Sequence, residues 1–420
     1  MFLHDSFACR QGKGTHAAVD RLEEFVRSVT RGGRRRAWFL QVDISNFFMS
    51  IDRRILFEMI ENGLRKQYGV PRDKLPLFCA DWNRFRAMRD LARTLILHDC
   101  TEEFTRKSPA SEWRHIEDRK SLFHCEPEKG LPIGNLTSQF FGNVYLNALD
   151  QFVKHELNAK FYLRYVDDFV LLHEDKHFLR DWLTRIEDFA LDRLGLRLNQ
   201  AAVKIRPVSC GINFLGYIVH PDHRLARRRV VGNFGARLDG FRKKLIVAQD
   251  EYVRYLFLPD VLEKLLAALN SYIAHLEKAS CRRLFQSILQ EHAWLKAFFF
   301  FEKGKAKRRW KPPREFPNLA SQYGWHRWRY PKSEILFQVG RFHEMYDDQA
   351  VAAAEAFNLS PLKPRIGERS RVGVPCCMAD PLARKMASAG QSVLVVKETG
   401  YPMLRLKERN PAVLYAPVVN

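Results

Sequence analysis

The residues best suited to chemistry in this 420-residue chain are the adjacent acids Asp167 and Asp168. They stand between two apolar stretches, residues 161–163 and 169–172, which predict a β-hairpin with both carboxylates at its tip. Two neighbouring carboxylates on a buried hairpin are unfavourable unless a cation neutralises them. A divalent metal ion that also binds substrate phosphates is the natural cation.

A second apolar strand, residues 39–44, carries Asp43 followed by Ile44. One carboxylate from each of two strands could hold the two metal ions that phosphoryl transfer to a sugar hydroxyl requires. We therefore predict that Asp43, Ile44, Asp167 and Asp168 form a site for two Mg²⁺ ions. Asp43 and Asp167 are the main ligands and Asp168 supports them. An isolated Asp-Asp pair also occurs in surface turns, so the assignment depends on the motifs around it.

The composition indicates a nucleic-acid partner. The net charge is +21 and the isoelectric point is about 9.7, which favours a polyanion such as nucleic acid. No apolar run approaches the roughly 20 residues that span a bilayer, and no signal peptide opens the chain. The eight cysteines include no C-x-x-C pair, which indicates reduced thiols and a cytoplasmic protein without a zinc site.

Five motifs in order carry a family resemblance. They are residues 43–52, 130–139, 165–168, 195 onward and 214–217, and they resemble motifs A to E of reverse transcriptases. The resemblance implies an α+β right-hand polymerase with a palm of antiparallel strands under helices and a helical thumb. It also implies an RNA-directed DNA polymerase, whose partners are template RNA, a cDNA primer and dNTPs.

The subfamily is suggested by motif B, where residues 133–139 read Ile-Gly-Asn-Leu-Thr-Ser-Gln. This variant, together with residues 12–16, resembles the enzymes of diversity-generating retroelements. That type implies error-prone cDNA synthesis opposite adenines and a small basic accessory protein. Two alternatives stay open: a reverse transcriptase of a group II intron or phage-defence system, and a non-catalytic nucleic-acid-binding remnant. The second alternative is motivated by the start of the chain, which lies already at the end of the expected fingers region. Arg10 and Lys13 would be the last basic residues of that region.

The resemblance also implies roles around the metal site. Phe48 would exclude a ribose 2′-hydroxyl, and Tyr165 would pack near the primer end. Ile133, Gly134 and Gln139 would shape the pocket beside the templating base, where an apolar Ile133 lowers discrimination between bases. Lys204 is a candidate acid for the leaving group or a solvated strand residue, and the primer grip would be Phe214, Leu215 and Gly216.

The end of the chain carries a second resemblance. Residues 334–346, 372–375 and 390–398 are similar to the mismatch-recognition domain of MutS proteins, which implies that Phe342 wedges into mispaired DNA and that Glu344 accepts from a base edge. Phe342 could equally start a helix with its ring in the core. Other predicted nucleic-acid contacts, each of which could also be solvated surface, are Arg228, Arg229, Lys243, Lys244, Arg308 and Arg309.

The sequence therefore predicts four parts. They are truncated fingers and palm at 1–222, a helical thumb at 223–302, a basic linker at 303–330 and a small α/β MutS-like module at 331–420.

Overall fold

The computed structural model describes residues 2–70, 82–102, 104–105, 107–313, 315–363, 370–403 and 406–418. The chain divides into one unit at Met1–Leu225 and another at Ala226–Asn420. Each unit is a mixture of helices and mainly antiparallel strands, in agreement with the predicted α+β class. No helix in the described part of the chain is long and apolar enough to cross a membrane.

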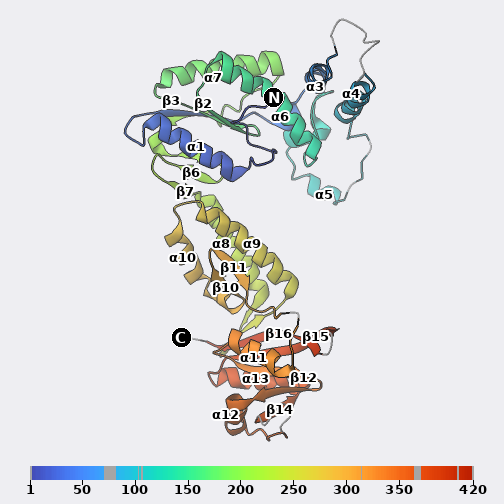
Figure 1. Cartoon of the computed structure of the whole chain (residues 1–420), viewed down its shortest axis with the longest axis vertical. Coiled ribbons are helices and arrows are strands. Elements are labelled where there is room, and N and C mark those ends of the chain that lie inside the picture. The colour runs from blue at the N-terminus through green and yellow to red at the C-terminus, as the bar shows by residue number, and fades with distance from the viewer. Residues whose placement is uncertain are drawn as a thin grey trace. The chain divides into compact units, whose positions relative to one another are not determined.

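The first unit is built on an antiparallel sheet of order β2-β3-β1-β4. Its strands are β1 (Trp38–Val42), β2 (Phe161–Tyr165), β3 (Asp168–His173) and β4 (Lys204–Pro207). Helices α1 (Thr15–Thr30) and α7 (Lys176–Leu194) lie on opposite sides of this sheet (Figure 1). The apolar residues of both helices recur at three- and four-residue spacing, so each helix buries one face against the strands.

The sequence also determines where α7 begins and ends. The Asp175 side chain accepts from the backbone N–H of His177 at 2.8 Å, and Gly195 ends the helix in the left-handed conformation at φ 61°. Both are favourable helix ends, because a carboxylate satisfies a free N–H and glycine adopts positive φ without strain. These caps therefore define the two ends of α7, which packs against β1 and β3.

The first unit contains further helices and strands. They are α2 (Phe47–Ser50), α3 (Arg53–Gln67), α4 (Trp82–Leu97), α5 (Ala110–Trp113), α6 (Leu136–Gln151), β5 (Ile212–Phe214), β6 (Tyr217–Val219), and β7 (Arg224–Ala226), which crosses into the second unit. Of these, α3, α4 and α5 lie to one side of the sheet (Figure 1). Gly142 of α6 lies against α2, because a Cβ there would come within 3.1 Å of the Phe47 ring and 3.4 Å of the Phe48 ring.

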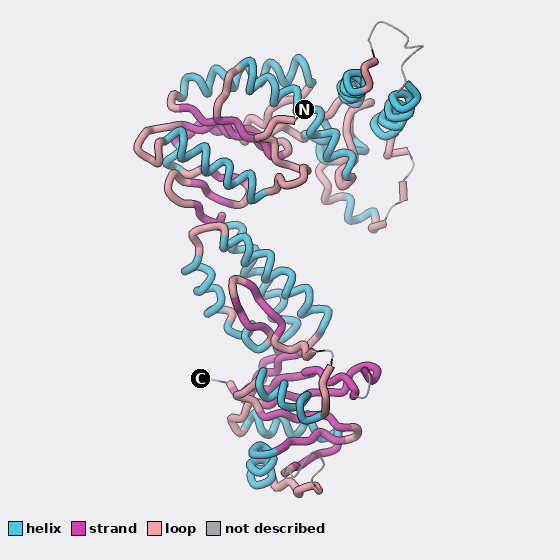
Figure 2. The backbone as a smooth tube through the Cα atoms, in the orientation of Figure 1, coloured by secondary structure: helices cyan, strands magenta, loops and turns pink. Residues whose placement is uncertain are grey.

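The second unit contains a seven-stranded sheet of order β14-β13-β12-β15-β16-β9-β8, seen as magenta strands in Figure 2. Its strands are β8 (Ile246–Ala248), β9 (Tyr252–Leu256), β12 (Glu334–Val339), β13 (Phe342–Tyr346), β14 (Arg371–Pro375), β15 (Val393–Met403) and β16 (Leu406–Pro417). The remaining elements are α8 (Arg228–Leu245), α9 (Pro259–Glu277), α10 (Arg282–Glu291), β10 (Phe299–Glu302), β11 (Lys305–Arg308), α11 (Leu319–Arg329), α12 (Asp347–Phe357) and α13 (Ala379–Ser388).

Two expectations about this unit are corrected. The segment predicted to be a helical thumb also contains the β8–β9 hairpin, and β9 pairs with β16 from Val413↔Leu256 to Pro417↔Tyr252. The segment 303–330, predicted to be a linker, is folded into β11 and α11 with Trp310 buried. The basic side chains misled the prediction, because Lys305, Lys307 and Arg308 extend into solvent from strand β11 while Ala306 is buried.

One hydrophobic core explains both corrections. It joins Phe234 and Leu269 of the helical part to Phe337 and Leu414 of the C-terminal sheet. The helical part and the C-terminal module therefore share a sheet and a core.

Candidate active site

The hairpin that carries the two acids forms as predicted. Tyr165 pairs with Asp168, so Val166 and Asp167 make a two-residue turn between β2 and β3. Val166 has φ 56°, which a β-branched residue adopts only under strain. The neighbouring strand β1 runs antiparallel to β3 with Val42 opposite Phe169, and this register brings Asp43 to the end of the sheet where Asp167 and Asp168 lie.

Asp43 and Asp167 line one cavity of about 410 Å³. Phe48 and Ile133 also line it, and the Ile133 side chain is 69% exposed. The cavity therefore combines two acids with two of the residues predicted to contact the sugar and the base. Its remaining lining includes residues that the sequence patterns did not single out: Ser45, Asn46, Arg119, Lys120 and Asn199.

The acids at this site repel one another. Burial, together with the charge of Asp43, raises the pKa of Asp167 to about 6. Burial and the charges of Asp43 and Asp167 raise the pKa of Asp168 to about 7, although a hydrogen bond from Gln41 and the charge of Lys204 oppose the shift. A site that disfavours its own negative charge has a strong preference for a cation.

Two amides support the carboxylates. Asn199 Nδ2 donates to Asp43 Oδ2 at 2.9 Å, and the Asn199 backbone N–H donates to the Asp43 carbonyl at 2.8 Å. Gln41 Nε2 donates to Asp168 Oδ1 at 3.2 Å and to the Asn213 carbonyl at 3.0 Å. Gln41 thus connects an acid of the hairpin to strand β5, whose last residue, Phe214, begins the predicted primer grip.

A buried arginine supports the turn itself. Arg164 has no exposed surface and forms a two-point ion pair with Asp150, with Nε–Oδ1 at 2.7 Å and Nη2–Oδ2 at 2.6 Å. Its Nη1 donates to the carbonyl of Val166 at 2.7 Å, and Nη2 donates to Ser6 Oγ at 3.0 Å. The guanidinium therefore holds the strained residue that precedes Asp167.

The donor chemistry fits a divalent cation. Mg²⁺ is commonly held by one or two carboxylates together with waters and substrate phosphates. In the described ranges no three His, Cys, Asp or Glu side chains come together as a complete metal cage. Asp43 and Asp167, with Asp168 beside them, offer the oxygen donors for an ion that substrate phosphates would complete.

The other predicted site residues occupy varied positions. The Tyr165 hydroxyl lies 3.2 Å from the Thr15 hydroxyl of α1. The exposed Gln139 accepts from Cys9 Sγ at 3.1 Å. Gly134 is exposed and has φ 106°. Lys204 is an exposed strand residue opposite Gln41. Phe214 is buried, and Leu215 and Gly216 form the tight turn between β5 and β6.

The predicted phosphate contacts differ in availability. Arg228, Arg229, Lys243 and Lys244 are exposed on α8. Arg308 instead makes a two-point ion pair with Glu263 at 2.7 and 2.6 Å. Arg309 donates to the carbonyls of Arg329 and Lys296, each at 2.7 Å. The arginines at 308 and 309 thus already have partners within the chain.

The Phe-x-Glu pair of the C-terminal module is divided between surface and interior. Phe342 begins strand β13, not a helix, and is 43% exposed. Glu344 is 2% exposed, and it accepts from Arg371 Nη1 at 2.8 Å and from the Tyr346 hydroxyl at 2.6 Å. Phe342 is available to a ligand, whereas Glu344 is held by its own domain.

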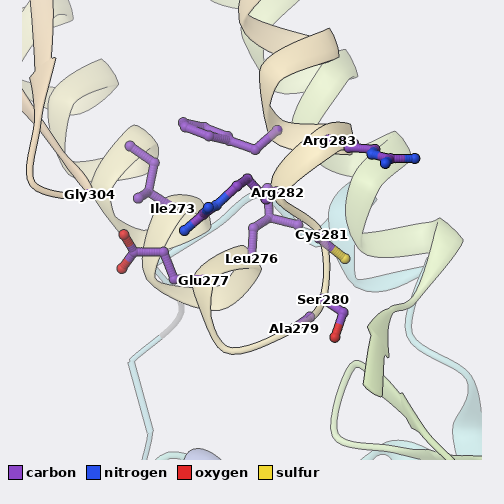
Figure 3. Close-up of a pocket in the computed structure, with 10 residues that line it drawn as sticks. Ile273, Leu276, Glu277, Ala279, Ser280, Cys281, Arg282, Arg283 and Gly304 are labelled. Carbon is purple, nitrogen blue, oxygen red and sulfur yellow. The ribbon is translucent and has the colours of Figure 1, made fainter. Parts of the chain in front are cut away.

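Another cavity, of about 820 Å³, lies in the second unit between α9, α10 and the β10–β11 turn (Figure 3). Glu277, Arg282 and Arg283 provide its charges, and Leu276 and Phe285 provide apolar surface. A single carboxylate is too little for two-metal chemistry. The candidate active site is therefore the cavity at Asp43 and Asp167.

Comparisons with solved structures find telomerases among the similar chains. No curated protein matches the chain. Telomerase from Candida tropicalis truncated from its C-terminal domain is similar, with 14% identity, TM-score 0.37, and coverage of 53% of this chain and 41% of that chain. Telomerase from Candida albicans, solved with a fragment of telomeric RNA, has 13% identity and TM-score 0.37. The match covers 68% of this chain and 44% of that chain. The chain thus spans less than half the length of these telomerases.

Two family profiles match the chain. MutS domain I matches residues 318–411, over the C-terminal module. The reverse transcriptase (RNA-dependent DNA polymerase) profile matches residues 1–219, about half of the chain and all of the sheet that carries the acids. The chain belongs to the reverse transcriptase family of RNA-dependent DNA polymerases.

Proposed function

We propose that this protein synthesises DNA on an RNA template, with the β2-β3-β1-β4 sheet as a palm and α8–α10 as the core of a thumb. The observation that carries the proposal is the convergence of Asp43 and Asp167 on one cavity inside the matched region. Two bound Mg²⁺ ions would activate the primer 3′-hydroxyl and neutralise the triphosphate. Primer extension by the full chain with dNTPs and Mg²⁺ on a primed RNA template tests the proposal, and no extension on RNA would contradict it.

The chain's own residues divide the remaining work. Asp43 and Asp167 hold the cations, while Asn199 and Gln41 fix the carboxylate orientations. Arg119 and Lys120 line the same cavity and contact Glu117 at 2.5 and 3.0 Å. These two cations can turn to the triphosphate, because charge-assisted bonds to phosphate are stronger than an exposed ion pair.

Phe48 selects the sugar in this proposal. Its ring lies 5.1 Å from the buried ring of Phe47 and borders the cavity beside Asp43. Replacing Phe48→Val should therefore open space for a 2′-hydroxyl and raise ribonucleotide incorporation relative to deoxynucleotide incorporation about tenfold or more. Single-nucleotide extension with matched rNTP and dNTP pairs measures this ratio, and Phe140→Val, a change at a 49% exposed ring of α6, is the control. An unchanged ratio would remove Phe48 from sugar selection.

We further propose that the enzyme belongs to the diversity-generating retroelement type and acts in the cytoplasm with a small basic accessory protein. Ile133 supports error-prone copying, because an apolar side chain in the cavity leaves no buried polar group unpaired when a wrong base enters. Sequencing the extension products distinguishes the types: errors concentrated opposite adenine support a retroelement, and uniform fidelity favours the group II intron or phage-defence alternative.

The exposed Phe342 supports a second proposed function, preference for mispaired duplexes. An aromatic ring can wedge into a weakened base step, and stacking on it contributes about 1–3 kcal/mol. In the full chain, Phe342→Ala should therefore lower the affinity for mispaired DNA at least about fivefold, while affinity for paired DNA stays unchanged. Fluorescence anisotropy measures both, with Val351→Ala, an exposed apolar change on α12, as the control. Equal losses on both duplexes would reject mismatch preference.

A further inference from the structure

The end of helix α11 presents an exposed tryptophan. Trp328 is 67% exposed, although tryptophan is strongly buried on average. A single exposed ring is common on protein surfaces and indicates nothing by itself. The residues around Trp328 make this one unusual.

Arg329 lies among three aromatic rings. Its guanidinium carbon is 4.4 Å from the centre of the Trp328 ring, 4.7 Å from that of Phe300 and 5.5 Å from that of Trp325. We call these four residues the Trp328 platform. The guanidinium covers part of Trp328 and holds its ring in place, while most of that ring stays open to solvent.

The cation of the platform has no acidic partner among the residues that the structure describes. Within the described ranges no carboxylate pairs with Arg329, and its Nε is buried without a hydrogen-bond partner. Burial lowers the pKa of Arg329, and the neighbouring Arg309 lowers it further. An arginine without an acidic partner is stabilised in its charged form by contact with an anion from outside the chain.

The local charge identifies the kind of anion. Residues 303–332 contain ten lysines and arginines and a single glutamate. A rigid aromatic face inside a basic surface is the arrangement that binds single-stranded nucleic acid, in which bases stack on rings and cations follow the phosphates. Bases in a duplex are stacked on one another and cannot reach such a face, so a duplex is the poorer occupant.

We propose that the Trp328 platform binds single-stranded RNA by stacking one base on Trp328, with Arg329 contacting the adjoining phosphate. The choice of RNA rests on the proposed function, because template RNA that has not yet been copied is single-stranded. The platform lies in the part of the chain that includes the MutS-like match, outside the region matched by the reverse transcriptase profile.

Anisotropy titrations of the full chain with labelled oligouridylate test the proposal. Trp328→Ala should weaken binding about 5- to 150-fold, the range expected for one lost base stack. Trp328→Phe should restore most of the affinity because it keeps a ring. Phe178→Ala, a change at a 52% exposed ring on α7, should leave the affinity unchanged. Equal affinity of Trp328→Ala and the unaltered chain would overturn the proposal.

Altered oligonucleotides can identify the group that stacks on the Trp328 ring. An abasic oligonucleotide of equal length should bind the unaltered chain and Trp328→Ala equally, since it has no base to stack; a difference there would overturn base stacking. Tighter binding of oligodeoxyuridylate than of oligouridylate would overturn the choice of RNA. Light scattering compares the molecular mass of Trp328→Ala with that of the unaltered chain. A difference would indicate that a second copy covers the ring, and would also overturn the proposal.

Primer extension separates this proposal from the proposed function. Trp328→Ala should still extend a primer at saturating template, but with a higher KM for a long single-stranded template. If the unaltered chain extends no primer while Trp328 still governs oligouridylate binding, the polymerase proposal fails and the platform stands. If extension occurs and Trp328→Ala changes neither binding nor KM, the platform fails alone.

Discussion

Asp167→Asn is expected to abolish nucleotide incorporation while it raises the melting temperature of the metal-free protein. An amide oxygen is a poor substitute for a carboxylate in holding Mg²⁺, so transition-state stabilisation by the metal is lost. Primer extension on RNA should show no product above background. Asp181→Asn, a change at an exposed acid of α7, should leave incorporation unchanged. Retained activity in Asp167→Asn would remove Asp167 from the mechanism.

The stability gain follows from the direction of the pKa shifts. Folding raises the pKa of Asp167 from 3.8 to about 6 and that of Asp168 to about 7, so the folded state binds protons more strongly than the unfolded chain. The folded state therefore loses stability as the pH rises from the ordinary carboxyl pKa of 3.8 through the raised pKa values of Asp167 and Asp168. Asn at 167 removes one of the repelling charges, so the variant should melt higher than the unaltered chain above the raised pKa. The two melting curves should converge in acid.

Magnesium should reverse the order of the two melting temperatures. A cation that binds only the folded state stabilises it by mass action, so Mg²⁺ should raise the melting temperature of the unaltered chain more than that of Asp167→Asn. Calorimetry across a magnesium series measures the difference. Equal magnesium responses would place the cation elsewhere.

Arg164→Met is expected to be among the most destabilising single changes in the first unit. The Asp150 carboxylate would stay buried without its partner, which typically costs about 3–5 kcal/mol of unfolding free energy. The variant should also lose activity, because the carbonyl of Val166 would no longer be held and Asp167 would lose its orientation. Chemical denaturation and primer extension report the two effects.

A double variant separates stability from orientation. Arg164→Met with Asp150→Leu removes both buried charges, so much of the lost stability should return. Activity should stay low, because the hydrogen bond to Val166 is still missing. Recovery of activity in the double variant would show that Arg164 acts only through folding and does not position Asp167.

The residues that make up the candidate site could be predicted where local pattern determines geometry. Apolar strands on both sides of Asp167 and Asp168 indicated the hairpin, and an apolar strand before Asp43 indicated its neighbour. The antiparallel register of β1 and β3 then brings Asp43 to the same end of the sheet, as the shared cavity shows. A continuous apolar run is a property of a short segment, so the sequence alone reveals it, and the central residues of β2 and β3 are buried without alternation.

The supporting residues could not be predicted in the same way. Asn199 is 156 positions from Asp43, and Ser6 is 158 positions from Arg164. No local pattern specifies partners at such separations. The one signal for Arg164 was a charged residue directly after the apolar stretch 161–163, on the predicted strand, where it must either be paired or disrupt the strand. The β8–β9 hairpin escaped prediction for a related reason: its pairing partner β16 lies about 160 positions away.

The pairing of β9 with β16 has a consequence for anyone who divides this protein by sequence similarity. A cut at residue 303 or 331 would remove the strand that covers β9 and would open the apolar interior that holds Phe234, Phe337 and Leu414. The C-terminal piece would carry an unpaired edge of β16, a template for aggregation. Fragments meant to isolate the MutS-like module should therefore start before α8.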